Sequence, residues 1–374
     1  MDRRFFLQGL GMVAGSQLLL GCQSRNQAVL VVEILTRSVP PQLIGKFRSD
    51  SKLSVEVNLK SSVEDLFLKL QNWQQLAASS NKQESSKMPS PLRLVSLGDA
   101  WLLPAIQQKL IQPLPVDQLT RWADLPPRWQ QLVQRDDKGQ LAPKGDIWGA
   151  PYRWGATLIA YRRDKFKALG WQPTDWADLW RPELQGRISL LNQGREVIGL
   201  TLKKRSKSYN TENPEAVTDL LKDLKALNHQ VKFYDSQHYL EPLILGDSWV
   251  AVGWSTDIFA AMAQEPEIAV VMPQAGTALW ADLWVQAQST VAPSVAQAAS
   301  QWINFWWDST VAKDLSRFTQ GLSPFARVEQ LTDKTQQLLV ENLQSFERSE
   351  FLTPLSAPSL KQYQRLWQQM RTTA

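Results

Sequence analysis

Short apolar runs of strand length alternate with amphipathic helical segments along most of this chain. Residues 29–35 form an apolar run broken only by Glu33, which is typical of a strand buried on both faces of a parallel sheet. Residues 54–59 alternate apolar and polar side chains, as a half-buried strand does, and residues 92–97 and 267–272 are further strand candidates. This alternation of strands and helices predicts an α/β fold with largely parallel sheets.

Two of the helical segments have recognisable beginnings. Asn213, Pro214 and Glu215 supply a capping residue, a proline at the first helical position and an acid in the first turn. The apolar stripe that follows consists of Val217, Leu220, Leu221, Leu224 and Leu227. Ser294 is expected to cap a second helix. Its stripe consists of Val295, Ala298, Ala299, Trp302, Ile303 and Trp306. Residues 78–90 are polar and patternless, and we expect an exposed loop there.

The N-terminal residues have the pattern of an export signal. Arg3 and Arg4 precede a short apolar stretch that runs through Leu20, which is shorter than the roughly 20 apolar residues of a membrane span. The order Arg-Arg-x-Phe-Leu resembles a twin-arginine (Tat) signal. We therefore expect residues 1–21 to be a signal peptide that is removed.

The motif Leu-Leu-Gly-Cys at the end of this stretch resembles a lipobox, in which Cys22 is acylated and becomes the new N-terminus. The alternative is a core cysteine behind a buried helix. The lipobox predicts a lipoprotein in the periplasm, held at the inner membrane through Cys22 and a linker over residues 22–26. Cys22 is the only cysteine in the chain, so the mature part has no disulfide.

The length and charge of the chain narrow the class of protein. Removing residues 1–21 from the 374 of the full sequence leaves 353, enough for two domains. The net charge of +5 comes without a run of like charges, and no basic cluster interleaved with aromatic residues suggests nucleic-acid binding. Most of the 17 tryptophans are expected to pack in the core, and a few in turns are candidates for a ligand cleft.

The inventory of reactive side chains does not favour an enzyme. With Cys22 assigned to acylation, thiol nucleophiles and thiolate metal sites are excluded. His229 is expected at the exposed end of a helix and His238 in a polar loop. The sequence has no glycine-rich phosphate loop, nucleophile elbow or zinc-binding helix motif. We expect no catalytic residue, no cofactor and no metal.

Specific resemblance begins near residue 148. The segments Gly149-Ala-Pro-Tyr-Arg-Trp-Gly-Ala-Thr157 and Trp176-Ala-Asp-Leu-Trp-Arg-Pro-Glu-Leu-Gln-Gly186 resemble the spermidine/putrescine-binding proteins of bacterial polyamine ABC importers. The match continues in order through Arg195-Glu196-Val197, Gly253-Trp254, Trp280-Ala281-Asp282 and Ile303-Asn304-Phe305. The resemblance implies a type II periplasmic-binding-protein fold, with two α/β lobes and a ligand cleft between them.

In that fold the chain crosses between the lobes more than once. The resemblance therefore places residues 27–157 and about 285–327 in lobe 1. It places residues about 158–284 and 328–374 in lobe 2.

The resemblance also implies a binding site made of carboxylates for ammonium groups and aromatic faces for the carbon chain. Glu196 and Asp282 match the carboxylates, and Trp254 and Trp280 match the walls of the cleft. The simpler alternatives are core packing for the two tryptophans, a strand-end cap for Asp282 and a first-turn acid for Glu196.

Other positions depart from the family pattern. In Leu35-Thr36-Arg37-Ser38 only Thr36 is kept and two aromatic residues are lost, while Arg37 brings a positive charge. In Gly98-Asp99-Ala100-Trp101, Asp99 offers a new carboxylate or a helix cap, and Trp101 replaces an aromatic or packs in the core. Gln193 stands where the family has an acid, which keeps a hydrogen-bond acceptor but loses its charge.

These features predict a solute-binding lipoprotein that captures a polyamine or a similar organic cation and passes it to ABC permease subunits. The alternatives are a receptor of the same fold for another amine-bearing or zwitterionic solute, and a sensory lipoprotein that transports nothing. We expect a monomer that binds no nucleic acid.

Overall fold

The computed structural model describes residues 30–80, 91–289, 293–326, 329, 331 and 333–372. The expected signal peptide over residues 1–21, the linker over 22–26 and Cys22 all lie outside these residues. In the part of the chain that is described, no helix has the length and apolar character needed to cross a bilayer.

Strands and helices alternate through the described residues, as the sequence predicts. The strands are β1 (Leu30–Leu35), β2 (Val55–Lys60), β3 (Leu92–Gly98), β4 (Ile111–Gln112), β5 (Gln134–Arg135), β6 (Asp146–Ile147), β7 (Ala150–Arg162), β8 (Ile188–Leu190), β9 (Val231–Tyr234), β10 (Val250–Trp254), β11 (Ile268–Val271), β12 (Ala278–Ala287) and β13 (Glu350–Phe351). The α-helices are α1 (Pro41–Ser51), α2 (Val63–Ser80), α3 (Leu102–Gln107), α4 (Pro127–Val133), α5 (Arg163–Leu169), α6 (Gly194–Lys204), α7 (Leu220–Gln230), α8 (Glu241–Leu245), α9 (Ser255–Met262), α10 (Pro293–Trp306), α11 (Ser309–Thr319), α12 (Lys334–Glu341), α13 (Leu343–Arg348) and α14 (Ala357–Arg371). Short 3₁₀ turns include η1 (Asp99–Trp101) and η6 (Pro214–Ala216).

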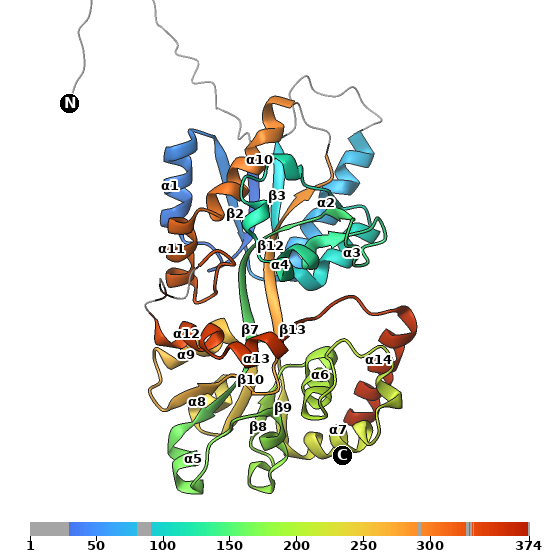
Figure 1. Ribbon diagram of the computed structural model, residues 1–374, viewed down its shortest axis with the longest axis vertical. Helices are drawn as coiled ribbons and strands as arrows, with labels where there is room; N and C mark the ends of the chain where they lie inside the picture. The colour runs from blue at the N-terminus through green and yellow to red at the C-terminus, as the bar shows by residue number, and fades with distance from the viewer. Residues whose placement is uncertain are drawn as a thin grey trace, which may run out of the picture.

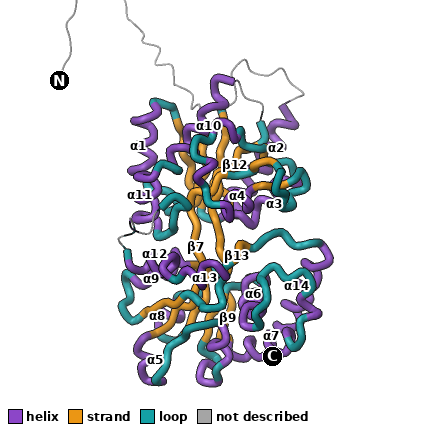
Figure 2. Tube along the Cα trace, in the orientation of Figure 1, coloured by secondary structure: helices purple, strands orange, loops and turns teal. Residues whose placement is uncertain are grey.

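Two long strands connect the two lobes of the molecule. Strands β7 and β12 run side by side from the upper lobe (lobe 1), which holds β1–β3, to the lower lobe (lobe 2), which holds β8–β11 (Figure 1). The strands lie at the centre of each lobe and the helices lie around them (Figure 2). The lobe boundaries predicted at residue 157 and near residue 285 fall inside these two strands, and they stay a prediction.

The sheet continues through both lobes in the order β2-β1-β3-β12-β7-β10-β8-β9. Its outer parts are parallel. In one part β1 pairs in parallel with β2 and β3, and in the other β8 pairs in parallel with β9 and β10. The prediction of largely parallel sheets is wrong for the centre, where β12 is antiparallel to both β3 and β7, and β10 is antiparallel to β7. The chain enters the second lobe along β7 and returns along β12, so these neighbours must run in opposite directions.

The predicted strands are confirmed, but several helix boundaries differ. Pro214 opens only the turn η6, and α7 begins at Leu220, because Asp219 has a left-handed backbone conformation with φ 57°. Ser294 is not a cap but lies inside the first turn of α10. Helix α2 extends through Ser80, so residues 78–80 are helical, and residues 81–90 lie outside the described part. His229 does lie exposed in the last turn of α7, as predicted.

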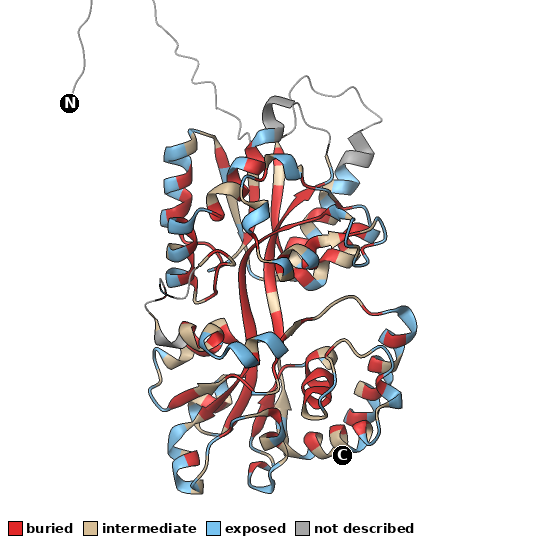
Figure 3. Cartoon of the chain, in the orientation of Figure 1, coloured by how far each residue is buried: buried red, intermediate tan, exposed pale blue. Residues whose placement is uncertain are grey.

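Aromatic packing dominates the core of the upper lobe. Trp284, Trp302 and Trp306 are fully buried, and Tyr152 stacks on Trp284 with ring centres 4.2 Å apart. Trp302 contacts Phe47 of α1 with ring centres 4.8 Å apart and Trp284 of β12 at 5.4 Å. The buried residues in Figure 3 line β7 and β12 as well as the inner faces of the surrounding helices. The expectation that most tryptophans pack in the core is confirmed for these positions.

Replacing Trp302 by alanine should lower the free energy of unfolding by about 3–5 kcal/mol, because it empties a fully buried site between α1, α10 and β12. Urea unfolding followed by circular dichroism measures the change. The matched control is Leu245→Ala in α8, at a side chain that is 77% exposed, where the change should stay within about 0.5 kcal/mol. Equal effects of the two substitutions would contradict this assignment of the core.

Candidate functional site

Alternate residues of β7 present one face of the sheet where the two lobes meet. Arg153, Gly155 and Thr157 are separated by two positions and therefore point to the same side of the strand. On β12, Asp282 lies directly opposite Arg153, and Trp280 lies opposite Gly155. Because opposite residues of an antiparallel pair share a face, these side chains meet on one surface, which we call the hinge face. The hinge face consists of Arg153, Gly155, Thr157, Trp254, Trp280 and Asp282.

The absence of a side chain at Gly155 makes room for the indole of Trp280. A Cβ atom at position 155 would lie 2.3 Å from Cζ2 of Trp280, which is closer than any tolerated contact. Trp280 is partly exposed, and its Nε1 is buried without a hydrogen-bond partner among the described residues. The indole therefore lies across the strand with part of its surface open to a ligand.

Asp282 has a cation of the protein itself as its partner. The guanidinium of Arg153 contacts Oδ2 of Asp282 through Nε at 2.8 Å and through Nη2 at 2.6 Å. Burial alone would lower the pKa of Arg153, but the carboxylate of Asp282 outweighs it and the pKa is raised. The same guanidinium lies 5.6 Å from the centre of the Trp280 ring, at the distance of a cation–π contact.

Sequence reasoning quoted Arg153 within its motif but did not name it as a site residue. A charged residue in an otherwise apolar strand was the signal that could have found it.

Glu196 approaches the hinge face from the first turn of α6. Its side chain is buried, and Oε1 accepts a hydrogen bond from Oγ1 of Thr157 at 3.1 Å. Its Oε2 is also buried but has no hydrogen-bond partner among the described residues. Burial raises the pKa of Glu196 to about 7, against the opposing effects of Thr157 and Arg195. One oxygen of this carboxylate is therefore available to a ligand.

On β10, Trp254 lies opposite Thr157 of β7. Its indole therefore lies on the same face of the sheet as the Thr157 hydroxyl that donates to Glu196. The backbone N–H of Trp254 donates to the hydroxyl of Tyr239 at 3.0 Å, and that hydroxyl donates to Asp257 at 3.1 Å. The ring of Tyr239 contacts Trp254 edge-on, with ring centres 6.3 Å apart. Tyr239 therefore holds the backbone of Trp254 and contacts its ring, and Asp257 holds the hydroxyl of Tyr239. Neither was identified from the sequence, because Tyr239 comes from the loop before α8 and Asp257 from α9.

Asp99 adds a carboxylate beside β12. It is the first residue of η1, it is buried, and its Oδ1 accepts a hydrogen bond from the backbone N–H of Ala281 at 3.0 Å. Burial raises the pKa of Asp99 to about 7, and the nearby Asp282 adds to this effect. The structure therefore brings Asp99 to the edge of the hinge face, between the two predicted residues Trp280 and Asp282.

The remaining predicted residues lie elsewhere. Trp101 is partly buried and packs on Phe67 of α2, with ring centres 4.8 Å apart. Thr36 is exposed, and its hydroxyl donates to the backbone oxygen of Lys60 at 2.9 Å. Gln193 is exposed and precedes α6 without capping it. No contact within the described residues joins Thr36 or Gln193 to the hinge face.

The charges around the hinge face favour a positively charged solute. The carboxyl groups of Asp99, Glu196, Asp257 and Asp282 interact electrostatically with one another or with Arg153, which is the cation on the face itself. Burying an ammonium group is costly unless a carboxylate pairs with it, and an indole face adds about 0.5–2 kcal/mol of attraction. Within the described ranges, no group of three or more histidine, cysteine or acidic side chains has the arrangement of a metal site.

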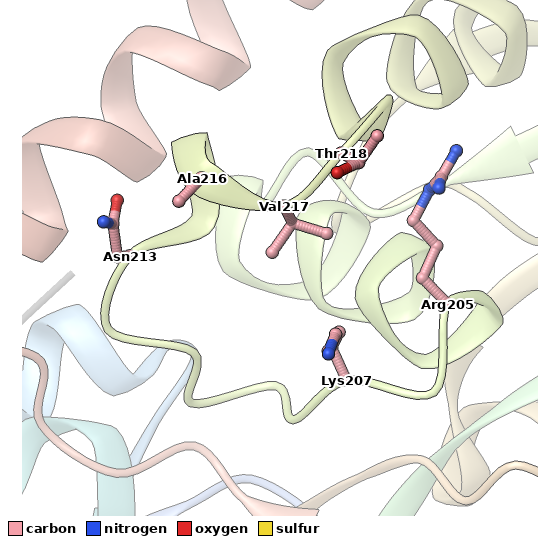
Figure 4. A pocket seen from close by; sticks show the side chains of 6 residues that line it. All are labelled: Arg205, Lys207, Asn213, Ala216, Val217 and Thr218. Carbon is pink, nitrogen blue, oxygen red and sulfur yellow. The ribbon is translucent and has the colours of Figure 1, made fainter.

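A pocket of about 300 Å³ lies on lobe 2 (Figure 4). Its walls come from Arg205, Lys207, Asn213, Ala216, Val217 and Thr218. Arg205 is already paired with Asp223 at 2.7 Å. None of the predicted site residues lines this pocket, so we do not assign the binding site to it.

Comparison with known proteins gives one family over most of the chain. Residues 94–347 match the family described as bacterial extracellular solute-binding protein. The spermidine/putrescine-binding periplasmic protein of Escherichia coli K12 is 28% identical over 284 residues, which cover 75% of this chain and 73% of that protein.

Solved structures show the same fold. A spermidine/putrescine substrate-binding protein of Streptococcus pneumoniae superposes with a TM-score of 0.75 at 19% identity, covering 91% of this chain and 98% of that one. A lipoprotein of Treponema pallidum gives a TM-score of 0.69 at 19% identity, with coverage of 91% and 98%. The predicted two-lobe α/β fold is confirmed. The prediction that the chain is not an enzyme agrees with the substrate-binding proteins to which it is similar.

The raised pKa of Asp99 makes stability depend on pH in a defined direction. Near pH 4 the carboxyl is neutral in the folded state and only about half ionised in the unfolded state, so its ionisation changes stability little there. As pH rises towards 7 only the unfolded state ionises, so the folded state loses stability. Asp99→Asn keeps the oxygen that accepts from Ala281. We therefore expect this variant to match the wild type near pH 4 and to be more stable by roughly 1–3 kcal/mol at pH 8.

Thermal and urea unfolding across pH 4–8 measure this difference. The control is Asp117→Asn, at an exposed acid in a short turn of lobe 1, where the change in stability should stay within about 0.5 kcal/mol. A loss of stability for Asp99→Asn at pH 8 would mean that the Asp99 carboxylate is not destabilised by burial.

Proposed function

Since this chain belongs to the family of bacterial extracellular solute-binding proteins, we propose that it captures a small amine-bearing organic cation, such as a polyamine, for an ABC importer. The observation that carries the proposal is Oε2 of Glu196, a buried carboxylate oxygen without a partner among the described residues. An ammonium group placed there would pair with it and complete its hydrogen bonds. Relatives named for binding spermidine and putrescine support this choice of ligand class.

The aromatic residues supply the second part of the proposed site. Trp254 and Trp280 each keep part of the indole surface exposed, and they lie on two strands that flank β7. The flat faces of these rings suit an alkyl chain and a neighbouring cation. Asp282 and Asp99 add negative charge at the Trp280 end. The site would therefore hold the carbon chain of the amine between the two indoles.

The position of the site suggests how binding is signalled to the membrane. The hinge face lies on the strands β7 and β12, which join the lobes, so a ligand there touches both sides of the junction. Closure of the lobes around the ligand would give the permease subunits a shape to recognise. We expect the receptor to act as a monomer.

We also propose that the protein works in the periplasm as a lipoprotein. The lipobox-like sequence ending in Cys22 supports acylation at that residue, and the twin-arginine-like start supports export by the Tat route. Durable attachment to the inner membrane needs more than one acyl chain or a second contact with the membrane.

A second candidate is a receptor for another amine-bearing or zwitterionic solute. The pairing of Asp282 with Arg153 favours it, because one of the carboxylates that the family resemblance assigns to the ligand already has a partner.

Isothermal titration of the purified protein with putrescine, spermidine, spermine and a panel of amino acids tests the proposal. We expect at least one amine to bind with a Kd of about 1 μM or less. Glu196→Gln should weaken that binding at least tenfold, about 1.4 kcal/mol, because the ammonium loses its charged partner. Glu183→Gln, at an exposed acid of lobe 2, is the control and should leave affinity unchanged.

The same titration repeated between pH 6 and 8 checks the role of the carboxylate. Because the pKa of Glu196 is about 7, amine affinity should fall as pH drops below 7. This dependence should be weaker in Glu196→Gln, where Asp99, whose pKa is also about 7, still titrates. Saturable heat only from solutes without an amine would contradict the proposed ligand class.

Cys22→Ala should release the protein from the membrane into the soluble periplasmic fraction, because the acceptor of the acyl chains is lost. Fractionation of cells with immunoblotting measures the distribution. The control is Ser24→Ala, which leaves the lipobox intact and should keep the protein on the membrane. Retention of the Cys22→Ala variant on the membrane would contradict the anchor.

A further inference from the structure

A guanidinium of the protein itself occupies the place beside Trp280 and Asp282 where the proposed function would put a ligand ammonium. Arg153 contacts Asp282 through two nitrogens, at 2.8 and 2.6 Å, and lies 5.6 Å from the centre of the Trp280 ring. These are the two interactions, a carboxylate and an indole face, that would recognise a ligand ammonium. The charge of Asp282 is therefore already neutralised by the protein.

Arg153 is held in this position by its surroundings. The residue is only 7% exposed, and its backbone lies opposite Asp282 in the antiparallel pair of β7 and β12. Gly321, which follows α11, packs against its aliphatic part. A Cβ atom at position 321 would lie 2.6 Å from Cγ of Arg153. Because backbone on one side and the ion pair on the other confine the side chain, a ligand would meet the guanidinium rather than displace it.

The other end of the site has the opposite character. Oε2 of Glu196 is buried and has no partner among the described residues, while Oε1 is held by Thr157. An ammonium there gains a free carboxylate oxygen. A second ammonium at the Trp280 end would face the like charge of Arg153 in a buried, poorly screened environment. The Glu196 end and the Trp280 end of the proposed site therefore favour different chemical groups on the ligand.

We propose that Arg153 is a specificity-determining residue that makes the receptor select amines with a single positive charge over diamines and longer polyamines. This inference rests on the proposed function, since it takes the hinge face to be an amine site. The ammonium pairs with Glu196, and an oxygen acceptor at the far end of the ligand faces the guanidinium of Arg153. A guanidinium carries five N–H groups, and the contact with Asp282 engages only its Nε and Nη2 nitrogens.

The test compares three four-carbon ligands by isothermal titration of the purified protein: putrescine, γ-aminobutyrate and the corresponding amino alcohol. We expect the wild type to bind γ-aminobutyrate or the amino alcohol at least about tenfold more tightly than putrescine. Arg153→Met removes the internal cation and frees Asp282 for a second ammonium. This variant should reverse the order, gaining at least about tenfold for putrescine.

Two further variants make the result independent of the folding of Arg153→Met. Arg153→Gln removes the charge but keeps a hydrogen-bond donor for Asp282, and it should shift the preference in the same direction. The matched control is Arg365→Met, at an exposed arginine of α14 that pairs with Glu215, which should leave the preference unchanged. Circular dichroism confirms that each variant is folded.

The possible failures are distinguishable. If the wild type binds putrescine more tightly than the singly charged ligands, the inference is overturned and the proposed amine receptor stands. If Arg153→Gln and Arg153→Met fold but gain nothing for putrescine, Arg153 does not set the charge of the ligand. If no amine binds to any of the proteins, the proposed function fails and the inference fails with it.

Discussion

The antiparallel pairing of β7 and β12 is the constraint on which the rest of this structure depends. Both strands pass from one lobe to the other, so their register determines which side chains meet where the lobes join. This register sets Arg153 opposite Asp282 and Gly155 opposite Trp280. A shift of β12 by one residue would turn Trp280 and Asp282 to the other face of the sheet, where Tyr152 and Trp154 pack in the core, and would separate them from Gly155 and Arg153.

The same pairing explains why a polar site exists inside a largely apolar sheet. Residues of β7 at even positions pack against buried tryptophans, and those at odd positions from 153 to 157 carry the polar face. Buried carboxyl groups are costly, and the raised pKa values of Asp99, Glu196 and Asp257 reflect this cost. A cationic ligand would offset the cost, which gives a physical reason for ligand binding to stabilise the folded protein. The ion pair of Arg153 with Asp282 already offsets part of the cost of burying these carboxyl groups without a ligand.

Family membership and local chemistry determine different properties of this protein. The match over residues 94–347 establishes the class of protein. The ligand is a separate question, because relatives that share about a quarter of their residues can differ at the few side chains that touch the solute. Here the carboxylate of Asp282 is paired within the protein, and only the contact geometry reveals this pairing.

The sequence by itself determined the α/β class and the four candidate strands. Through the family motifs it also predicted Glu196, Trp254, Trp280 and Asp282 as candidate site residues. Periodicity and motif order carry this information, because they depend on residues close together in the chain. The sequence could not decide the direction of the central strands or the start of α7, which follow from the return of the chain through the hinge and from the left-handed backbone at Asp219. Nor could it show that Thr36 and Gln193 are exposed while Asp99 reaches Ala281. The pairing of Arg153 with Asp282 joins residues separated by 129 positions, and only the tertiary structure decided it, because such contacts arise from strand register rather than from local pattern.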